Sequence, residues 1–181
     1  DVNLKGKAAK EEFQVKKPAV YALMPDDFTG MKPKVVVKEN DVVKVGDALF
    51  VDKNHPEIKF VSPVSGRVTM VERGDRRKVL SVRVEADAEL QYVDFGKKSA
   101  GQMTAQEVKA LLLESGLFAF FKQRPYDVTA NPTDTPKAIF VSAFNSMPLA
   151  ADFEYVLRGR EADFQAGLDA LAKMAKTYLG V

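Results

Sequence analysis

The spacing of apolar and polar residues predicts a β-rich region over residues 18–95. Residues 18–95 are rich in valine and are interrupted by turn residues such as Gly46 and Gly66. Short apolar runs separated in this way predict strands of about four to seven residues. Apolar and polar positions alternate strictly in 67–73 and 80–87, as is typical of half-buried strands. The pattern therefore predicts a small all-β sandwich or barrel.

A helix is predicted after a polar, glycine-rich linker over residues 96–103. Thr104 and Glu107 have the spacing of a capping box, in which hydroxyl and carboxylate each satisfy a backbone N–H. Apolar residues follow at helical spacing, and Gly116 is the expected helix end.

The remaining sequence predicts the elements of an α/β layer. Residues 125–137 contain three prolines and predict a loop, 137–144 a short buried strand, and 153–158 a short helix. One face of a longer final helix is predicted to carry Phe164, Leu168, Leu171, Ala175 and Tyr178, with Gly180 as its cap. Because this final helix has no predicted partner strand, we expect the sheet to continue beyond Val181. The predicted division is 1–95, a linker at 96–103, and a partial α/β domain at 104–181.

Composition and charge limit the classes of function. The chain has 181 residues, of which 46% are hydrophobic, enough for a substantial core. Its 27 cationic and 25 acidic side chains leave a net charge of +2, too balanced to indicate a nucleic-acid surface or a strongly membrane-binding protein. The absence of cysteine excludes disulfides, thiolate iron–sulfur ligands and a cysteine nucleophile in this chain. No apolar run approaches the roughly 18 residues of a transmembrane helix.

No catalytic constellation is visible in the sequence. It contains no P-loop, dinucleotide fingerprint, nucleophile elbow or zinc-protease motif. His55 is the only histidine and cannot form a metal site alone, so we expect it at a solvated hairpin tip. The charged turn at 72–78 is interpreted as a solvated face, with a salt-dependent contact with another subunit as the alternative. From the residues alone, this is a binding or assembly module.

Two stretches in the β-rich part carry a first resemblance. "NDVVKVGDAL" (40–49) and "VSPVSGRV" (61–68) resemble the two halves of the biotinyl/lipoyl-type barrel-sandwich hybrid. Carrier domains of that kind present a lysine at the hairpin tip between the halves. Here His55, Pro56 and Glu57 take that place, and Lys53 lacks the flanking pattern. The resemblance implies the fold without the carrier chemistry.

A second resemblance covers essentially the whole chain. Six stretches, in order, resemble the N-terminal part of the A-subunit family of sodium-translocating NADH:quinone oxidoreductases: 3–7, 30–53, 60–68, 73–85, 111–127 and 136–152. The resemblance implies a component of an oxidoreductase and translocase that lies at the cytoplasmic face of the bacterial inner membrane. It implies peripheral attachment through partner subunits, no redox cofactor in this chain, no catalysis by this segment alone, and a contribution to ubiquinone binding. The cofactors FMN, FAD, riboflavin and iron centres, and the Na⁺ path, would belong to partner subunits.

That family is in turn similar to the flavin- and NADH-binding subunit of complex I and to the C-subunit of the Rnf complex. The resemblance implies a mixed α+β fold, with the barrel-sandwich hybrid followed by part of a Rossmann-like α/β domain. In the complex I protein, Ser-Gly-Leu leads into a glycine-rich flavin loop. Here "FAFFKQRPYD" follows Ser115 to Leu117, and "SAFNSMPLAAD" stands where an acidic nucleotide-binding stretch is expected. We interpret the loops 116–127 and 142–152 as degenerate flavin/NADH loops filled with apolar side chains.

Candidate site residues come from these two loops. Core packing accounts for Phe118, Phe120 and Phe121, and the alternatives are a quinone pocket or a subunit contact. The quinone-pocket candidates are Phe118, Phe121, Lys122, Arg124, Tyr126, Phe144 and Met147. Two other functions stay open: a purely structural adaptor, and a protein similar to the Rnf C-subunit.

Overall fold

The computed structural model describes residue 6, residues 8–96 and residues 98–181, and the chain forms two compact units. The first, the barrel unit, consists of residues 17–97 and 109–135. The second, the α/β unit, consists of residues 1–16, 98–108 and 136–181. Residues 109–135 thus join the barrel unit. Each unit thus combines segments from different parts of the sequence, and the domain boundaries at 95 and 103 stay a prediction.

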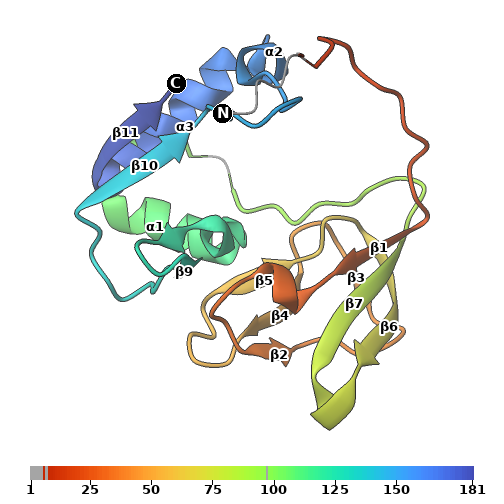
Figure 1. Ribbon diagram of the computed structural model, residues 1–181. Coiled ribbons are helices and arrows are strands. Elements are labelled where there is room, and N and C mark those ends of the chain that lie inside the picture. The colour runs from red at the N-terminus through yellow and green to blue at the C-terminus, as the bar shows by residue number, and fades with distance from the viewer. Residues whose placement is uncertain (1–5, 7, 97) are drawn as a thin grey trace. The chain divides into compact units, whose positions relative to one another are not determined.

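The barrel unit is built from two antiparallel sheets (Figure 1). The four-stranded sheet has the order β1-β7-β6-β3, formed by β1 (Val20–Leu23), β3 (Val42–Val43), β6 (Gly66–Arg73) and β7 (Val79–Ala86). The three-stranded sheet has the order β2-β4-β5, formed by β2 (Pro33–Val35), β4 (Ala48–Asp52) and β5 (Lys59–Val61). Two short 3-10 helices connect these strands, η1 (Pro25–Asp27) and η2 (Asp75–Arg77). The predicted β-rich sandwich or barrel is confirmed.

The core of the barrel unit follows from the alternation seen in the sequence. In β7, Val82 and Val84 are fully buried, whereas Glu85 is exposed and Arg83 is half-buried. The inward residues of both sheets meet in one cluster, which includes Phe50 and Phe60 with stacked rings 5.0 Å apart. Each buried side chain of this size contributes roughly 1.5 to 3 kcal/mol.

Gly66 is required where β6 begins. Its φ is +152°, and a Cβ built there would lie 1.8 Å from the Glu85 carbonyl oxygen. The two strands could not approach this closely with any other residue. Gly46, the other turn glycine of this region, also has a positive φ, of +98°.

Helix α1 (Ala105–Glu114) begins and ends as predicted. Thr104 Oγ1 accepts a hydrogen bond from the Glu107 N–H (3.2 Å), and the Glu107 carboxylate accepts one from the Thr104 N–H (2.8 Å). The helix ends at Glu114, and Gly116 stops it two residues later by adopting the left-handed conformation with φ +77°.

After α1, the chain returns to the barrel core. The 3-10 helix η4 (Leu117–Phe120) contacts β5, and a short hairpin follows, formed by β8 (Lys122–Gln123) and β9 (Val128–Thr129). The Thr129 N–H donates to the Thr29 carbonyl (3.0 Å), which ties this hairpin to the barrel.

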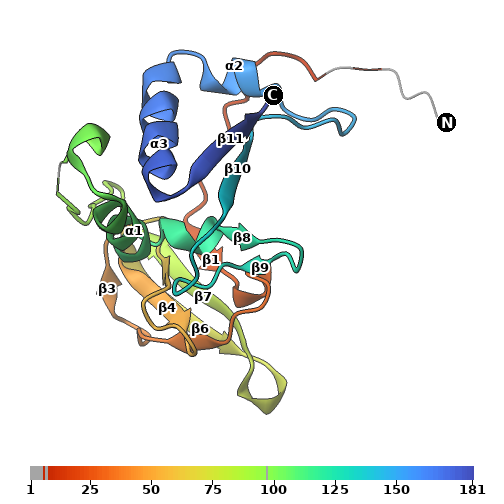
Figure 2. The same cartoon turned by 90° about the vertical axis from the view of Figure 1, so that its left-hand side faces the viewer.

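The α/β unit contains a two-stranded parallel sheet with helices beside it (Figure 2). Its elements are β10 (Ala138–Ser142), β11 (Lys176–Gly180), α2 (Phe153–Leu157), α3 (Glu161–Met174) and the 3-10 helix η3 (Ala100–Gln102). The predicted short helix near 153–158 is confirmed, and η3 lies within the predicted linker. Lys173 on α3 donates to the carbonyl oxygens of Gly101 (2.9 Å) and Met103 (2.7 Å), which holds η3 against α3.

The prediction for the end of the chain was wrong. Helix α3 ends at Met174, so Ala175 and Tyr178 do not belong to its apolar face and Gly180 does not cap it. Residues 176–180 instead form β11, which pairs in parallel with β10, so the predicted lack of a partner strand was also wrong. The reason is that a short apolar run fits both the helical and the strand period, and pairing with β10 decides between them.

The predicted burial of the strand within 137–144 holds only in part. Ile139 is buried, but Phe140 is 78% exposed. Phe140 lies opposite Tyr178 in the parallel register, and their rings stack 5.2 Å apart. Helix α3 packs beside β11, while this aromatic side of the sheet stays exposed among the described residues.

Candidate functional site

The seven quinone-pocket candidates are divided between the two units. Phe118, Phe121, Lys122, Arg124 and Tyr126 belong to the barrel unit, whereas Phe144 and Met147 belong to the α/β unit. Each group is therefore a separate candidate site.

In the barrel unit, the phenylalanines after Gly116 differ in burial. Phe118 is 4% exposed and is part of the barrel core, and its ring stacks on Phe121 at 5.5 Å. Phe121 is half-buried against the same core. Core packing is confirmed for these two residues. It was wrong for Phe120, which is 69% exposed and meets Phe28 only at its edge, with 6.0 Å between ring centroids.

The polar candidates of this group lie on the exposed β8–β9 hairpin. Lys122 and Arg124 are exposed, and Arg124 Nη1 is 3.6 Å from the Asp127 carboxylate. Tyr126 is 74% exposed. A ligand touching these groups would reach the Phe118 ring only if the segment moved, because that ring is covered.

Two backbone N–H groups of the loop 116–127 are paired within the turn itself. The Ala119 N–H donates to Gly116 O (3.3 Å), and the Phe121 N–H donates to Phe118 O (3.0 Å). A Cβ at Gly116 would lie 2.6 Å from Val61 Cγ1, so this glycine allows the close approach of the turn after α1 to β5. Anion-binding glycine loops work through unpaired N–H groups that a phosphate can approach, and this turn packs against protein instead.

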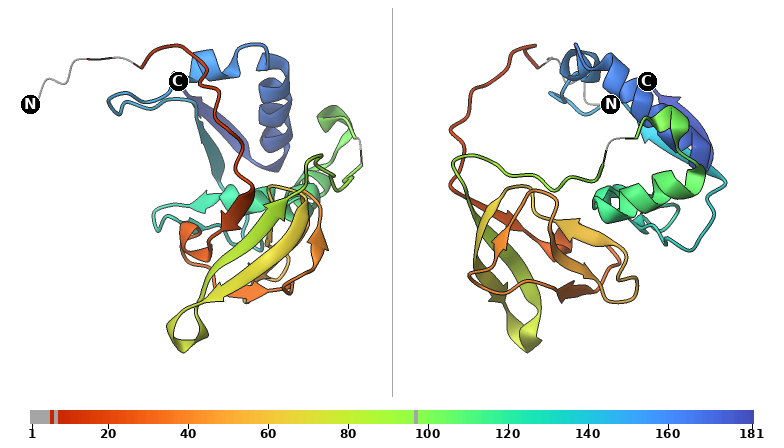
Figure 3. Two further views of the ribbon diagram at one scale, coloured as in Figure 1. Left: turned by 90° about the vertical axis from the view of Figure 1, so that its right-hand side faces the viewer. Right: turned by 180° about the vertical axis from the view of Figure 1, so that it is seen from behind.

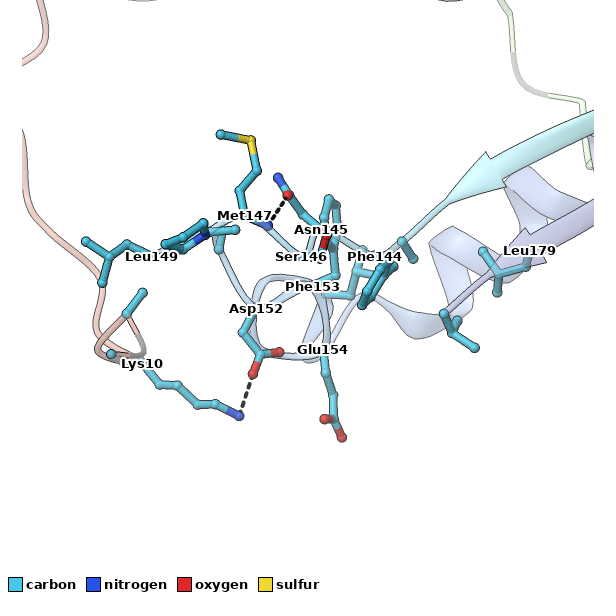
Figure 4. Close-up of a pocket in the computed structure, with 18 of the residues that line it drawn as sticks. Lys10, Phe144, Asn145, Ser146, Met147, Leu149, Asp152, Phe153, Glu154 and Leu179 are labelled. Atoms are coloured by element: carbon cyan, nitrogen blue, oxygen red, sulfur yellow. Dashed lines mark hydrogen bonds and ion pairs between the residues drawn. The ribbon is translucent and has the colours of Figure 1, made fainter. Parts of the chain in front are cut away.

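The second candidate site is a pocket of about 850 Å³ in the α/β unit (Figure 4). The loop 143–154 forms most of its wall, including Phe144 and Met147. Phe164 of α3 and Leu179 of β11 also line it, together with the N-terminal segment around Lys10. The predicted degenerate loop 142–152 thus lines a hollow surface in this structure.

The pocket has an apolar side and a charged side. Phe144 is 60% exposed and Met147 70% exposed, so both offer apolar surface. On the charged side, Lys10 Nζ lies 2.7 Å from Asp152 Oδ2, and the Met147 thioether points away from this pair (Figure 4). A ligand with an apolar body and a small polar head suits such a surface.

Asp152 has two structural partners. Its Oδ1 accepts a hydrogen bond from the Tyr155 N–H (3.1 Å) and so caps α2. The hydrogen bond from Lys10, followed by the one from Tyr155, lowers the pKa of Asp152. The same contact with Asp152 raises the pKa of Lys10. Both groups are therefore charged at neutral pH.

Sequence reasoning missed Lys10 as a pocket residue. Its partner lies far away along the chain, and no motif links the two positions. His55 lies in the connection between β4 and β5, at the hairpin tip as expected. Its side chain is half-buried rather than fully solvated, with 31% exposed and Nδ1 3.8 Å from Glu57 Oε1.

Two further features limit the chemistry of the described part of the chain. No group of three or more His, Cys, Asp or Glu side chains there is placed to hold a metal ion. None of its helices is both long and apolar enough to cross a bilayer.

Comparison with known proteins places the chain in a family. Residues 1–87 match the family model of the NqrA N-terminal barrel-sandwich hybrid domain, and residues 103–181 match that of the NqrA second alpha/beta domain. These matches confirm the predicted order of a barrel-sandwich hybrid followed by an α/β domain.

Several curated relatives are named as the A-subunit of a Na(+)-translocating NADH-quinone reductase. The relative from Actinobacillus pleuropneumoniae serotype 5b (strain L20) is 38% identical over 155 residues, covering 84% of this chain and 34% of the relative. The Yersinia pestis relative is 36% identical over 161 residues, covering 87% and 36%. The relative from Pseudomonas aeruginosa (strain UCBPP-PA14) is 35% identical over 176 residues, covering 95% and 39%. The chain spans little more than a third of the length of these relatives. With both of its parts matched by models of NqrA domains, the chain belongs to the NqrA family, the A-subunit family of Na(+)-translocating NADH-quinone reductases.

Proposed function

We propose that this chain acts as an NqrA module of a Na(+)-translocating NADH-quinone reductase and contributes to quinone binding and subunit assembly. The names of relatives that are 35 to 38% identical support membership in that complex. The observation that carries the quinone proposal is the pocket of about 850 Å³ with apolar side chains on one side and a single ion pair on the other.

The quinone is proposed to contact the α/β unit rather than the barrel unit. Phe144 and Met147 are exposed in the pocket, whereas Phe118 is 4% exposed in the barrel core. A quinone ring and its isoprenoid tail are largely apolar, and the two ring carbonyls need one or two donors. Lys10 supplies an ammonium group on the charged side of the pocket, where it already pairs with Asp152. The other candidates, Phe121, Lys122, Arg124 and Tyr126, do not line this pocket.

The chain is proposed to bind no flavin or nicotinamide cofactor of its own. Support comes from the two loops that correspond to nucleotide-binding segments in the complex I protein. One packs Phe118 and Ala119 into the barrel core, and the other carries Phe144 and Met147 without a glutamate before Asp152. FMN, FAD, riboflavin, iron centres and the Na⁺ path are assigned by this proposal to partner subunits. Through those partners, the chain would be attached peripherally at the cytoplasmic face of the bacterial inner membrane.

The structural adaptor remains the competing function. It is favoured by the exposed Phe140–Tyr178 stack, which offers apolar surface on one side of the β10–β11 sheet. An adaptor would bind none of the small molecules of the complex.

Ligand-observed NMR on the 181-residue chain tests these proposals, with FMN, NADH and a short-chain ubiquinone compared side by side. We expect saturation transfer to the quinone alone, and its loss in Phe144→Ser and Met147→Ser variants. Phe120→Ser is the matched control, because Phe120 is a similarly exposed ring in the barrel unit (69% against 60% for Phe144). Transfer to FMN or NADH would overturn the filled-loop interpretation. No transfer to any of the three would favour the adaptor.

A further inference from the structure

A cationic hairpin tip projects from the barrel unit. Strands β6 and β7 extend past the rest of the barrel and are joined by residues 74–78 (Figure 3). This turn together with Arg73, the last residue of β6, is here called the arginine tip (residues 73–78). The arginine tip contains three arginines and a lysine, with Asp75 as its only acidic residue.

The backbone of the arginine tip is strained at two arginines. Arg76 has φ +53° and Arg77 has φ +62°, the left-handed region that favours glycine and asparagine. Elsewhere in the same barrel unit, a left-handed turn position is occupied by Asn40, with φ +75°. Turn geometry therefore does not account for arginine at 76 and 77, and the side chains themselves need a reason.

The fold makes little use of these two side chains. Lys78 pairs with Asp26 at 2.6 Å, and Arg73 donates to the Arg77 carbonyl at 3.3 Å. Arg76 and Arg77 are exposed, and neither forms an ion pair with any residue that the structure describes.

The nearest acidic side chain on β6 is already paired. Glu72 near the end of β6 accepts hydrogen bonds from Ser81 (2.7 Å) and then Arg83 (2.7 Å), which lower its pKa. Within the arginine tip itself, Asp75 is the one acidic residue, and Asp26 of η1 is paired with Lys78. The nearly balanced charge of the whole chain therefore conceals a local cationic surface.

We propose that the arginine tip binds the phosphates of anionic lipids at a bilayer surface. A guanidinium group presents a planar pair of donors that suits phosphate oxygens. A standard protein interface needs about 800 Å² from each partner with an apolar centre, and a narrow tip whose exposed apolar neighbour is Leu80 offers much less. Lipid headgroups bind cations individually, so they suit a small projecting tip better than an acidic protein does. This inference goes beyond the proposed function and is independent of the quinone pocket.

The expected effect follows from the usual strength of such contacts. Each arginine near an anionic bilayer strengthens partitioning roughly fivefold, so removal of Arg76 and Arg77 together should weaken it roughly 30-fold. Added salt should weaken the binding further, because charges at a surface are screened over about 10 Å at 0.1 M salt.

Vesicle flotation of the 181-residue chain at low salt provides the test. Phosphatidylcholine vesicles with and without phosphatidylglycerol are compared for the wild type and for an Arg76→Asn/Arg77→Asn variant. The matched control is Lys53→Gln/Arg67→Gln, which removes two exposed cations of the barrel unit outside the arginine tip. We expect the wild type and the control to float with phosphatidylglycerol vesicles only, and the asparagine variant to lose this binding.

Thermal unfolding of the asparagine variant is the second readout. Asparagine tolerates the left-handed conformation, so its Tm should equal or exceed that of the wild type. A lower Tm would mean that the arginines stabilise the fold, which overturns the strain argument. Equal flotation with both vesicle types, or unchanged flotation of the asparagine variant, would overturn the proposal. If the arginine tip instead bound an acidic protein in the absence of vesicle binding, lipid would be the wrong partner.

Discussion

Gly116→Ala tests whether the end of α1 is held against the barrel as the structure has it. Gly116 has φ +77°, and a Cβ there would lie 2.6 Å and 2.8 Å from the two methyl carbons of Val61 and 3.2 Å from the Lys59 carbonyl oxygen. The substitution therefore adds a methyl group to a closed contact and also strains the backbone.

Two terms give the size of the effect. An alanine in the left-handed region costs about 1 kcal/mol relative to glycine. Overpacking of a closed contact costs about 1 to 3 kcal/mol more. The free energy of unfolding of the barrel unit should fall by about 2 to 4 kcal/mol. With a urea m-value of about 2 kcal/mol per M, the midpoint should drop by about 1 to 2 M.

The assay is urea unfolding followed by NMR signals of the buried Val68 and Val82, which report on the barrel unit alone. Gly96→Ala is the control, because Gly96 lies in the same unit at φ +80° with nothing within 4 Å of the position that a Cβ would take. It should lose only about 1 kcal/mol of strain energy. In a Val61→Ala background, Gly116→Ala should cost less than it does in the wild type, because the two methyl carbons are gone and only the Lys59 carbonyl oxygen remains close. Equal losses for Gly116→Ala and Gly96→Ala in the wild-type background would refute the close packing of the turn at Gly116 against β5.

Two further predictions concern the phenylalanines that follow Gly116 and the capping residue Glu107 of α1. Phe118→Ala should destabilise the barrel unit by about 3 to 5 kcal/mol, because the ring is buried in its core. Phe120→Ala should cost under about 1 kcal/mol, because that ring is exposed. The same urea titration measures both variants, and similar losses would contradict the assigned burial. Hydrogen bonds from Lys98 and then Thr104 lower the pKa of Glu107 from 4.5 to about 2, so its stabilising effect is complete above about pH 4.5 and is lost as the pH falls through 2. The Tm of Glu107→Gln should therefore change less than that of the wild type between about pH 4.5 and pH 2, and parallel Tm curves would show that the carboxylate has no such role.

Local sequence signals predicted the elements that depend mainly on residues close together in the chain. The capping box at Thr104 and Glu107 involves residues three apart, and the helix end at Gly116 needs only the backbone freedom of glycine. Both are present in the structure. The β-rich part was also predictable, because alternation of valine with polar residues specifies the two faces of a strand before any partner is known.

The candidate site was less predictable, because it depends on contacts between distant segments. Phe118 and Phe120 are two residues apart in the same apolar run, but one enters the core and the other faces solvent. Lys10 reaches Asp152 across most of the chain, and no spacing rule could link them. Phe144 and Met147 were chosen from the loop that lines the pocket, but the pocket itself arises from the meeting of that loop with α3, β11 and the N-terminal segment.

By itself, the sequence determined the β-rich barrel, the start and end of α1, and the resemblance to the NqrA family, because these depend on alternation, capping chemistry and the order of short stretches along the chain. Tertiary structure alone decided that residues 176–180 are a strand rather than the end of a helix, and that residues 109–135 complete the barrel unit. The physical reason is that a strand gains its hydrogen bonds from a partner, here β10, and an apolar ring gains its stability from whichever core is within reach. The residues around a strand or a ring in the sequence do not specify which partner strand or which core it will meet.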